Sequence, residues 1–289
     1  MELSEPILIR VGHSPDADDA FMFYGLAQGR IPTGRYQFQH QLADIETLNR
    51  WALEGRLELT ALSVHAYAYV ADRYWLCPCG ASVGDGYGPI LVAKSSLSFD
   101  ALRRAVIAVP GTMTTAYLTL CLYLGREFRP VIVPFDKIIP AVQEEAYGAE
   151  PVQAGLVIHE GQLTYAQHGL HLLEDLGRWW QAQTGLPLPL GVNGVRKDLG
   201  PETAAQVCRL LRESIRYGLE HREEALEYAL GFARGLARPQ ADRFVGMYVN
   251  HWTLDLGAQG RQAVQELLRR GWQAGIIPRP VQPEWVDLE

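Results

Sequence analysis

The feature that most constrains the fold of this chain is its alternation of short apolar runs with stretches of helical spacing. The largely apolar runs at residues 7–12, 57–62 and 154–158 have the length and composition of buried strands. Most such runs are followed by a segment whose apolar residues recur every three or four positions, as in an amphipathic helix. Strands that alternate with helices predict an α/β fold, in which parallel sheets carry helices on both faces.

The expected strands span residues 7–12, 36–45, 57–62, 75–83, 89–93, 106–109, 131–134 and 154–158. The expected helices span residues 18–30, 46–55, 63–70, 114–124, 138–145, 172–183, 223–232 and 261–272, and the pattern is already helical from residue 201. Residues 186–195 contain two prolines and two glycines, which suits a segment that crosses between lobes better than a central strand.

The helical segment from residue 201 onward contains no strands for a third sheet. Its helices are therefore expected to pack against one of the sheets formed by the earlier residues. This predicts two α/β lobes joined by two chain crossings. The larger, discontinuous lobe would hold residues 1–94 and 192–289, and the smaller lobe residues 95–191. The cleft between two such lobes is the default site for a small molecule.

Composition limits the class of protein. Apolar residues make up 48% and charged residues 20% of the 289 residues, as in a globular protein. The net charge of −7 argues against a nucleic-acid or anionic-membrane partner, because there is no basic surplus to neutralise phosphates. No signal peptide and no apolar run of about 18 residues is visible, so we expect a cytoplasmic protein without a membrane span.

The four cysteines, Cys77, Cys79, Cys121 and Cys208, fit no zinc spacing, and Cys77-Pro-Cys79 is one residue short of a CxxC redox motif. We expect reduced, mostly buried thiols.

Four segments that each follow a predicted strand carry the candidate site residues. In the first, His13 precedes three acids. Asp16 as a helix N-cap, with Asp18 and Asp19 in the first turn, would be ordinary capping. Three acids behind a histidine exceed what a cap requires, so we expect at least one of His13, Asp16 and Asp19 to face a ligand.

The second segment contains Ala61, Leu62 and Ser63, where a strand becomes a helix. Small residues there let a ligand approach the N–H groups of the helix start. Ser63 is equally suited to cap the helix, so both interpretations of its hydroxyl stay open.

The third segment is a tight turn into a helix that offers the hydroxyls of Thr112, Thr114 and Thr115 before Ala116. The first N–H groups of a helix are unpaired and favour an anion. Capping alone needs one threonine, so we expect this helix start to bind a substrate carboxylate. No Gly-Lys-Thr/Ser follows, which excludes a Walker loop.

The fourth segment is a buried strand, residues 155–158, that ends on His159. Ligands bind at the carboxyl ends of strands in open α/β sheets, and histidine titrates near neutral pH. His159 is therefore a candidate general base, although a histidine held by packing alone fits the same pattern. The histidines lack zinc spacing, and Glu160 either orients His159 or is simply solvated.

Together these segments resemble a known enzyme family. The sequences HSPDADDAFMFY at residues 13–24, TALS at 60–63, GTMTTA at 111–116 and GLVIHEG at 155–161 are similar, in this order, to those of the 1,4-dihydroxy-6-naphthoate synthase family of menaquinone biosynthesis by the futalosine pathway. The resemblance covers nearly the whole chain, and its first and last motifs are the specific ones.

The resemblance implies a two-lobed, periplasmic-binding-protein-like type II fold used as a cytoplasmic enzyme. It implies a carbon–carbon lyase that converts cyclic dehypoxanthinylfutalosine to 1,4-dihydroxy-6-naphthoate and dihydroxyacetone, without a metal or organic cofactor. The family's proton acceptor falls on His159, and its substrate contacts fall on Ala61, Leu62, Ser63, Thr115 and Ala116.

We further expect the helix start at Thr114 to hold the carboxylate, and Asp16 or Asp19 to bind the sugar-derived hydroxyls. The partner is therefore a small-molecule carboxylate, and the oligomeric state stays open. Two rival functions remain: a solute-binding protein of the same fold, which would carry an export signal, and the sister pathway enzyme chorismate dehydratase. The His-Glu-Gly motif and the opening HSPDADD favour the synthase.

Overall fold

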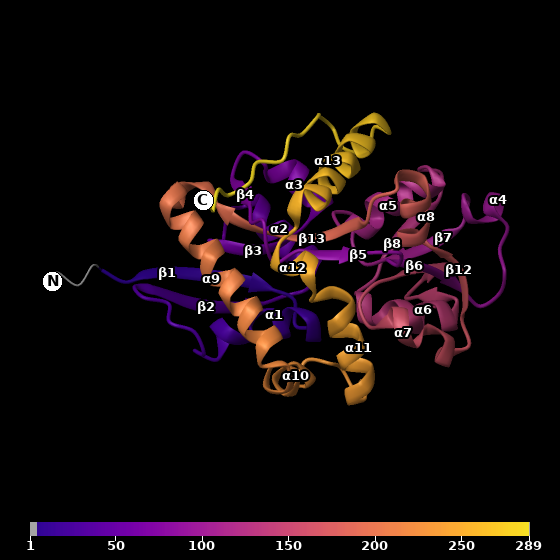
Figure 1. The fold of residues 1–289 in the computed structure, drawn as a ribbon. Coiled ribbons are helices and arrows are strands. Elements are labelled where there is room, and N and C mark those ends of the chain that lie inside the picture. Colours follow the sequence, from indigo (N-terminus) through magenta and orange to yellow (C-terminus); the bar gives the residue numbers. More distant parts are fainter. Residues whose placement is uncertain (1–4, 289) are drawn as a thin grey trace.

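The computed structural model describes residues 5–288, which form two lobes that each contain a five- or six-stranded mixed sheet (Figure 1). The first sheet has the order β2-β1-β3-β13-β4, with β5 also paired to β13. Its strands are β1 (Ile7–His13), β2 (Tyr36–Leu42), β3 (Leu59–Ser63), β4 (Tyr74–Leu76), β5 (Ser82–Gly84) and β13 (Leu188–Arg196).

The second sheet has the order β12-β6-β11-β7-β8. Its strands are β6 (Ile90–Ala93), β7 (Val106–Val109), β8 (Arg129–Ile132), β11 (Ala154–Val157) and β12 (His171–Asp175). A separate short hairpin of β9 (Ala146–Tyr147) and β10 (Glu150–Pro151) precedes β11 in the sequence.

The sheets are mixed, so the expectation of purely parallel sheets was wrong. β1 pairs in parallel with β2 and β3, and β7 in parallel with β8 and β11. The antiparallel pairs involve β6 and β13: β6 pairs with β11 and β12, and β13 with β3, β4 and β5. These two strands directly follow the two chain crossings, and there a strand enters a sheet without the helical crossover that makes neighbours parallel.

Helices cover both sheets. The first lobe carries α1 (Ala17–Ala27), α2 (Ile45–Leu53), α3 (Val64–Val70), α9 (Pro201–Glu220), α10 (Arg222–Leu230), α11 (Arg238–Tyr248), α12 (His251–Leu254) and α13 (Gly257–Gln273). The second carries α4 (Phe99–Leu102), α5 (Thr115–Leu124), α6 (Ile138–Glu144), α7 (Gly161–Thr164) and α8 (Leu176–Thr184).

The C-terminal helices return to the first lobe, as expected (Figure 1). Ser214 of α9 ties α9 to α1, because its hydroxyl donates to the Met22 carbonyl and accepts from the Leu26 N–H at 2.9 and 3.1 Å. No helix within residues 5–288 is both long and apolar enough to cross a membrane.

Two segments differ from the prediction. β13, expected to be only a crossing segment, lies inside the first sheet. Its Pro189 sits where the register with β5 shifts, a position that tolerates a missing N–H. A Cβ on Gly194 would lie 2.6 Å from Leu62 Cδ1, so this glycine allows close packing. Residues 171–175 form β12, and α8 begins only after its N-cap Asp175.

The sheets also place the chain crossings a few residues earlier than expected. β6 belongs to the second sheet, so the first crossing precedes Ile90 and does not follow residue 94. All of β13 belongs to the first sheet, so the second crossing precedes Leu188 and not residue 192. A short apolar run does not reveal which sheet it will join, and this limits how well sequence alone can place such a boundary.

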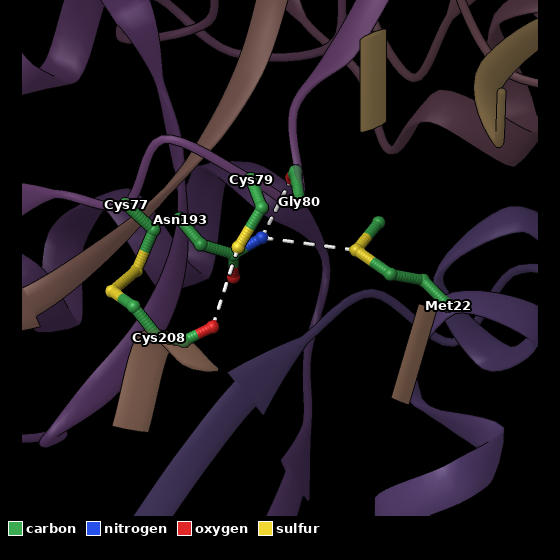
Figure 2. The surroundings of a disulfide bond; sticks show 6 residues. All are labelled: Met22, Cys77, Cys79, Gly80, Asn193 and Cys208. Atoms are coloured by element: carbon green, nitrogen blue, oxygen red, sulfur yellow. Dashed lines mark hydrogen bonds between the residues drawn. A yellow bond between two sulfur atoms is a disulfide. The ribbon is translucent and has the colours of Figure 1, made fainter. Parts of the chain in front are cut away.

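The cysteine prediction was wrong for one pair. Cys77, which follows β4, forms a disulfide with Cys208 of α9, across a Cα–Cα distance of 5.8 Å (Figure 2). The partners lie 131 residues apart in the sequence, so no local spacing reveals them. Cys79 and Cys121 are free and buried.

Candidate functional site

A cavity lies between the two lobes and receives all four predicted segments. It is bordered by the start of α1 after β1, the end of β3, the start of α5 after β7, and the residue after β11. Eight of the predicted site residues line it: Asp16, Asp19, Ala61, Ser63, Thr114, Thr115, Ala116 and His159. The carboxyl ends of neighbouring strands thus bring distant segments to one place.

His13 and Leu62 do not reach this cavity. The His13 ring stacks on Phe23 at a centroid distance of 4.5 Å, and its Nε2 lies 3.1 Å from His40 Nδ1. Burial, together with the nearby His40, lowers the pKa of His13 to about 4, so it is a neutral packing residue. Leu62 is fully buried in the hydrophobic core.

His159 faces a carboxylate from the other lobe. Its Nδ1 lies 3.1 Å from Oδ2 of Asp16, a buried residue that also caps α1 through its Oδ1, 3.3 Å from the Asp19 N–H. A carboxylate at Nδ1 favours the tautomer with its proton on Nδ1, which leaves the Nε2 lone pair free to accept a proton. The Phe135 ring packs edge-on against the imidazole at 4.7 Å.

The backbone of His159 lies in the left-handed region, with φ of 54°. Only three non-glycine residues in the described part of the chain have positive φ, and such strain concentrates at functional sites. The conformation turns the chain sharply at the end of β11. This turn sends the side chains of His159 and Glu160 to different partners.

Glu160 does not orient His159. Its Oε1 lies 3.1 Å from Nη1 of Arg234, which comes from the other lobe. Arg234 also donates from Nη2 to the Pro15 carbonyl at 2.8 Å and stacks over the Phe135 ring at 4.2 Å. Asp16 is therefore the group that orients the catalytic candidate, and Glu160 is part of a contact between the lobes.

The acidic residues at the start of α1 have unusual environments. Burial and the neighbouring Asp16 carboxylate raise the pKa of both Asp18 and Asp19 well above the ordinary value. Asp19 Oδ2 accepts the Ser14 N–H at 2.7 Å. Ligand atoms of Asp16, Asp18 and His159 lie within 4.8 Å of one another, so these three side chains could together hold a divalent ion.

The start of α5 forms another part of the wall. Thr114 caps the helix, since its Oγ1 accepts from the Tyr117 N–H at 3.1 Å, and Thr115 Oγ1 donates to the Leu190 carbonyl at 2.6 Å. Both hydroxyls are thus engaged, contrary to the expectation that they are free for a ligand. The N–H groups of Thr115 and Ala116, at the first two helical positions, have no partner within the helix.

Ser63 adds a hydroxyl to this wall. Its Oγ accepts from Asn49 Nδ2 at 3.0 Å, and its N–H donates to Asn49 Oδ1 at 2.9 Å. Because the oxygen already accepts a hydrogen bond, its own proton is free to point elsewhere. The Ser63 hydroxyl and the α5 N–H groups are neutral donors to an anion.

Several residues that line the cavity carry no recognisable signal in the sequence. Asn193 lies in β13, which was not predicted as a strand, and Tyr248 ends α11, a helix that was not predicted separately. Gln162 of α7 contacts Tyr248 across the cavity, with Nε2 2.9 Å from the hydroxyl oxygen. Because these residues come from segments far apart in the chain, no local motif marks them.

The chain is similar to known proteins over almost its whole length. A family model described as menaquinone biosynthesis matches residues 9–273. A Thermus thermophilus protein named 1,4-dihydroxy-6-naphtoate synthase is 44% identical over 94% of this chain and 98% of its own length. A Streptomyces coelicolor protein of the same name is 36% identical over 93% of this chain and 95% of its own length.

Solved structures show the same fold. A crystal structure of an Archaeoglobus fulgidus protein, 48% identical, covers 93% of this chain and 98% of its own, with a TM-score of 0.88. The alkanesulfonate-binding protein SsuA from Xanthomonas axonopodis pv. citri is 16% identical, covers 97% of each chain and has a TM-score of 0.72. These neighbours confirm the expected two-lobed, periplasmic-binding-protein-like fold.

Proposed function

The chain belongs to the menaquinone biosynthesis family, and from this premise we propose that it forms 1,4-dihydroxy-6-naphthoate from cyclic dehypoxanthinylfutalosine, with release of dihydroxyacetone. The two relatives named as 1,4-dihydroxy-6-naphtoate synthase, each matched over nearly the full chain, support this activity. The reaction is a carbon–carbon lyase step. The chemistry needs a positioned base and an enclosed site more than it needs a redox group.

The observation that carries the proposal is the contact between His159 and Asp16. The carboxylate holds the imidazole with Nε2 as the basic nitrogen, in a cavity that both lobes enclose. Nε2 takes the proton of a sugar-derived hydroxyl, and the carbon–carbon bond next to it breaks. The oxygen then becomes a carbonyl, and the electron pair passes into the ring, which becomes aromatic. A general base of this kind contributes about 10²–10⁴-fold in rate.

We assign the substrate carboxylate to the part of the cavity wall that offers hydrogen-bond donors, which is the start of α5 together with Ser63. The N–H groups of Thr115 and Ala116, with the Ser63 hydroxyl, offer neutral donors at a helix N-terminus. Ala61 lies beside Ser63 and contributes a small apolar surface. None of the described residues that line the cavity is a lysine or an arginine. We therefore assign the carboxylate to the neutral donors of Ser63, Thr115 and Ala116.

The two rival functions receive less support. The solute-binding proteins share the fold at 16% identity or below, which establishes architecture alone. The relatives at 36% and 44% identity carry the naphthoate synthase name, and this favours the synthase over chorismate dehydratase.

We also propose that the enzyme works in the cytoplasm on a small-molecule carboxylate. The biosynthetic role of the family supports this location, whereas the Cys77–Cys208 disulfide is a feature more common in oxidising compartments. The two observations are compatible if the bond is protected from reductants by burial of its cysteines, which are both fully buried.

The test is an assay of the purified chain with cyclic dehypoxanthinylfutalosine, with detection of 1,4-dihydroxy-6-naphthoate by mass. His159→Asn is the matched variant, because asparagine tolerates the left-handed backbone at this position. We expect it to bind the substrate and to form product at least a hundredfold more slowly. Full turnover by His159→Asn would show that His159 is not the general base. Absence of product with the unchanged chain would contradict the proposed activity itself.

A further inference from the structure

Two cavity residues carry buried oxygen atoms that have no hydrogen-bond partner. Among the described residues, five buried side-chain polar atoms are unpaired, and two of them, Asp18 Oδ1 and Asn193 Oδ1, belong to residues that line the interlobe cavity. Asp18 is 6% exposed and Asn193 2% exposed. Buried polar atoms are nearly always paired, so two orphans at one cavity point to a ligand that completes them.

The other carboxyls at this end are already engaged. Asp16 accepts the Asp19 N–H with one oxygen and contacts His159 with the other. Asp19 accepts the Ser14 N–H. Asp18, which lies between them in the sequence, is the acid of the three with a buried oxygen that has no partner, whereas Asp16 and Asp19 are the residues that the sequence suggested for this role.

The amide of Asn193 is held in one orientation. Its Nδ2 donates to the Gly80 carbonyl at 2.7 Å and lies 3.8 Å from Met22 Sδ (Figure 2). Since Nδ2 is fixed by this hydrogen bond, Oδ1 is the atom left to accept from a ligand. Gly80 permits the arrangement, because a Cβ at this residue would lie 2.6 Å from Nδ2.

The local charge selects a neutral group. Asp18 Oδ1 and Asn193 Oδ1 are both acceptors, so the group that completes them must carry a donor, as a neutral hydroxyl does. An anionic group would be repelled by Asp16, and it finds neutral donors instead at the start of α5.

We propose that Asp18 and Asn193 form a hydroxyl-binding subsite that recognises the polyol part of the substrate. The inference rests on the proposed function, and it deepens that function by orienting the substrate. The carboxylate points to α5, and the sugar-derived hydroxyls point to the start of α1, beside His159. The base and the group it deprotonates are thereby brought to the same end of the cavity.

Binding measurements in the His159→Asn background test the subsite without turnover. Calorimetry would compare the cyclic substrate with the product 1,4-dihydroxy-6-naphthoate, which lacks the sugar-derived fragment. We expect Asp18→Ala to weaken binding of the cyclic substrate about tenfold and to leave naphthoate binding unchanged. Asp18→Asn, which can donate and accept, restores most of the lost affinity. Asn193→Ala should likewise weaken binding of the cyclic substrate and leave binding of the naphthoate unchanged.

Thermal unfolding separates recognition from folding. Asp18→Ala should not lower the Tm, because it removes a buried carboxyl oxygen that has no hydrogen-bond partner. Equal weakening of both ligands, or of neither, overturns the subsite while the activity stands. If the His159→Asn protein binds the naphthoate but never the cyclic compound, the proposed function fails and the subsite fails with it. Substrate binding that requires Mn²⁺ and is abolished by EDTA overturns the subsite in favour of a metal at Asp16, Asp18 and His159.

Discussion

Arg234 of the first lobe forms an ion pair with Glu160 of the second lobe, with Nη1 3.1 Å from Oε1. Glu160 directly follows the candidate base His159 in the sequence. The same guanidinium binds the Pro15 carbonyl and covers the Phe135 ring. The contact is partly shielded, since the two side chains are 26% and 18% exposed. It joins the lobes at the edge of the cavity and so favours the closed arrangement.

We therefore predict that Arg234→Asn raises the KM for the substrate several-fold and changes kcat less. Asparagine suits the left-handed backbone of residue 234, where φ is 49°. A half-shielded ion pair of this kind contributes about 0.5–1 kcal/mol, and the ring contact adds a similar amount. Arg238→Asn, which removes ion pairs to Glu223 and Glu227 within one lobe, is the control. An equal effect of both variants on KM would contradict a role in closure.

The second prediction concerns Asp16. Asparagine caps a helix as well as aspartate does, so Asp16→Asn keeps α1 while it removes the charge facing His159. We expect kcat to fall by about tenfold or more, because the imidazole loses the group that fixes its tautomer and stabilises its protonated form. Steady-state kinetics, with circular dichroism as the folding check, measure this. Unchanged kcat in a folded variant would separate Asp16 from the chemistry.

The order of strands and helices could be predicted from the sequence because each segment has a local pattern. The pattern predicts a strand at residues 106–109 and a helix at residues 114–124, and the structure has both, with Thr114 as the N-cap of the helix. β13 could not be predicted, because its one proline and two glycines, with Pro187 just before it, disfavour a strand unless a register shift and close packing accommodate them. Those accommodations depend on partners far away in the chain.

The candidate site, like the fold, was predictable only where a local pattern marks its residues. His159 and the start of α5 follow strands, and position at a strand end is a local signal. The partner of His159 was not local: Glu160 is adjacent in sequence, but Asp16, 143 residues away by number, makes the contact. Asn193 and Tyr248 carry no pattern of their own and became visible only when the chain was folded.

The third prediction isolates a backbone N–H at the start of α5. Thr115 is the first helical residue and Thr114 before it is extended, with ψ of 151°, so proline fits at residue 115. Thr115→Pro removes both the N–H and the hydroxyl that binds Leu190, whereas Thr115→Val removes the hydroxyl alone. We expect the proline variant to have a KM about ten times that of the valine variant, as one charge-assisted hydrogen bond is lost. Equal KM values would place the carboxylate elsewhere.

The fourth prediction concerns the disulfide between β4 and α9. A bond that closes a loop with a sequence separation of 131 residues restricts the unfolded chain strongly. Cys77→Ser should therefore lower the free energy of unfolding by about 2–5 kcal/mol, whereas Cys121→Ser, at a free buried thiol, lowers it less. Denaturation curves with and without reductant measure the difference. Alkylation of all four cysteines in the unreduced, denatured protein would contradict the bond.

The last prediction follows from His13, which is neutral in the folded protein because burial and the adjacent His40 lower its pKa from 6.5 to about 4. The unfolded chain takes up a proton on this residue below pH 6.5, but the folded chain does so only near pH 4. The stability that His13 provides is therefore complete above pH 6.5 and is lost as the pH falls to 4, by about 3 kcal/mol. Asp18 and Asp19 have raised pKa values and act in the opposite direction.

His13→Gln, which has no proton to gain, should lose less stability than the unchanged chain when the pH falls from 6.5 to 4. The contributions of Asp18, Asp19 and of the similarly buried His65 are common to both proteins, so they cancel in the difference. Chemical denaturation at several pH values measures the slope, and His168→Gln, at an exposed histidine, is the matched control. Equal slopes for His13→Gln and the unchanged chain would mean that His13 is protonated in the folded state and has a role other than packing.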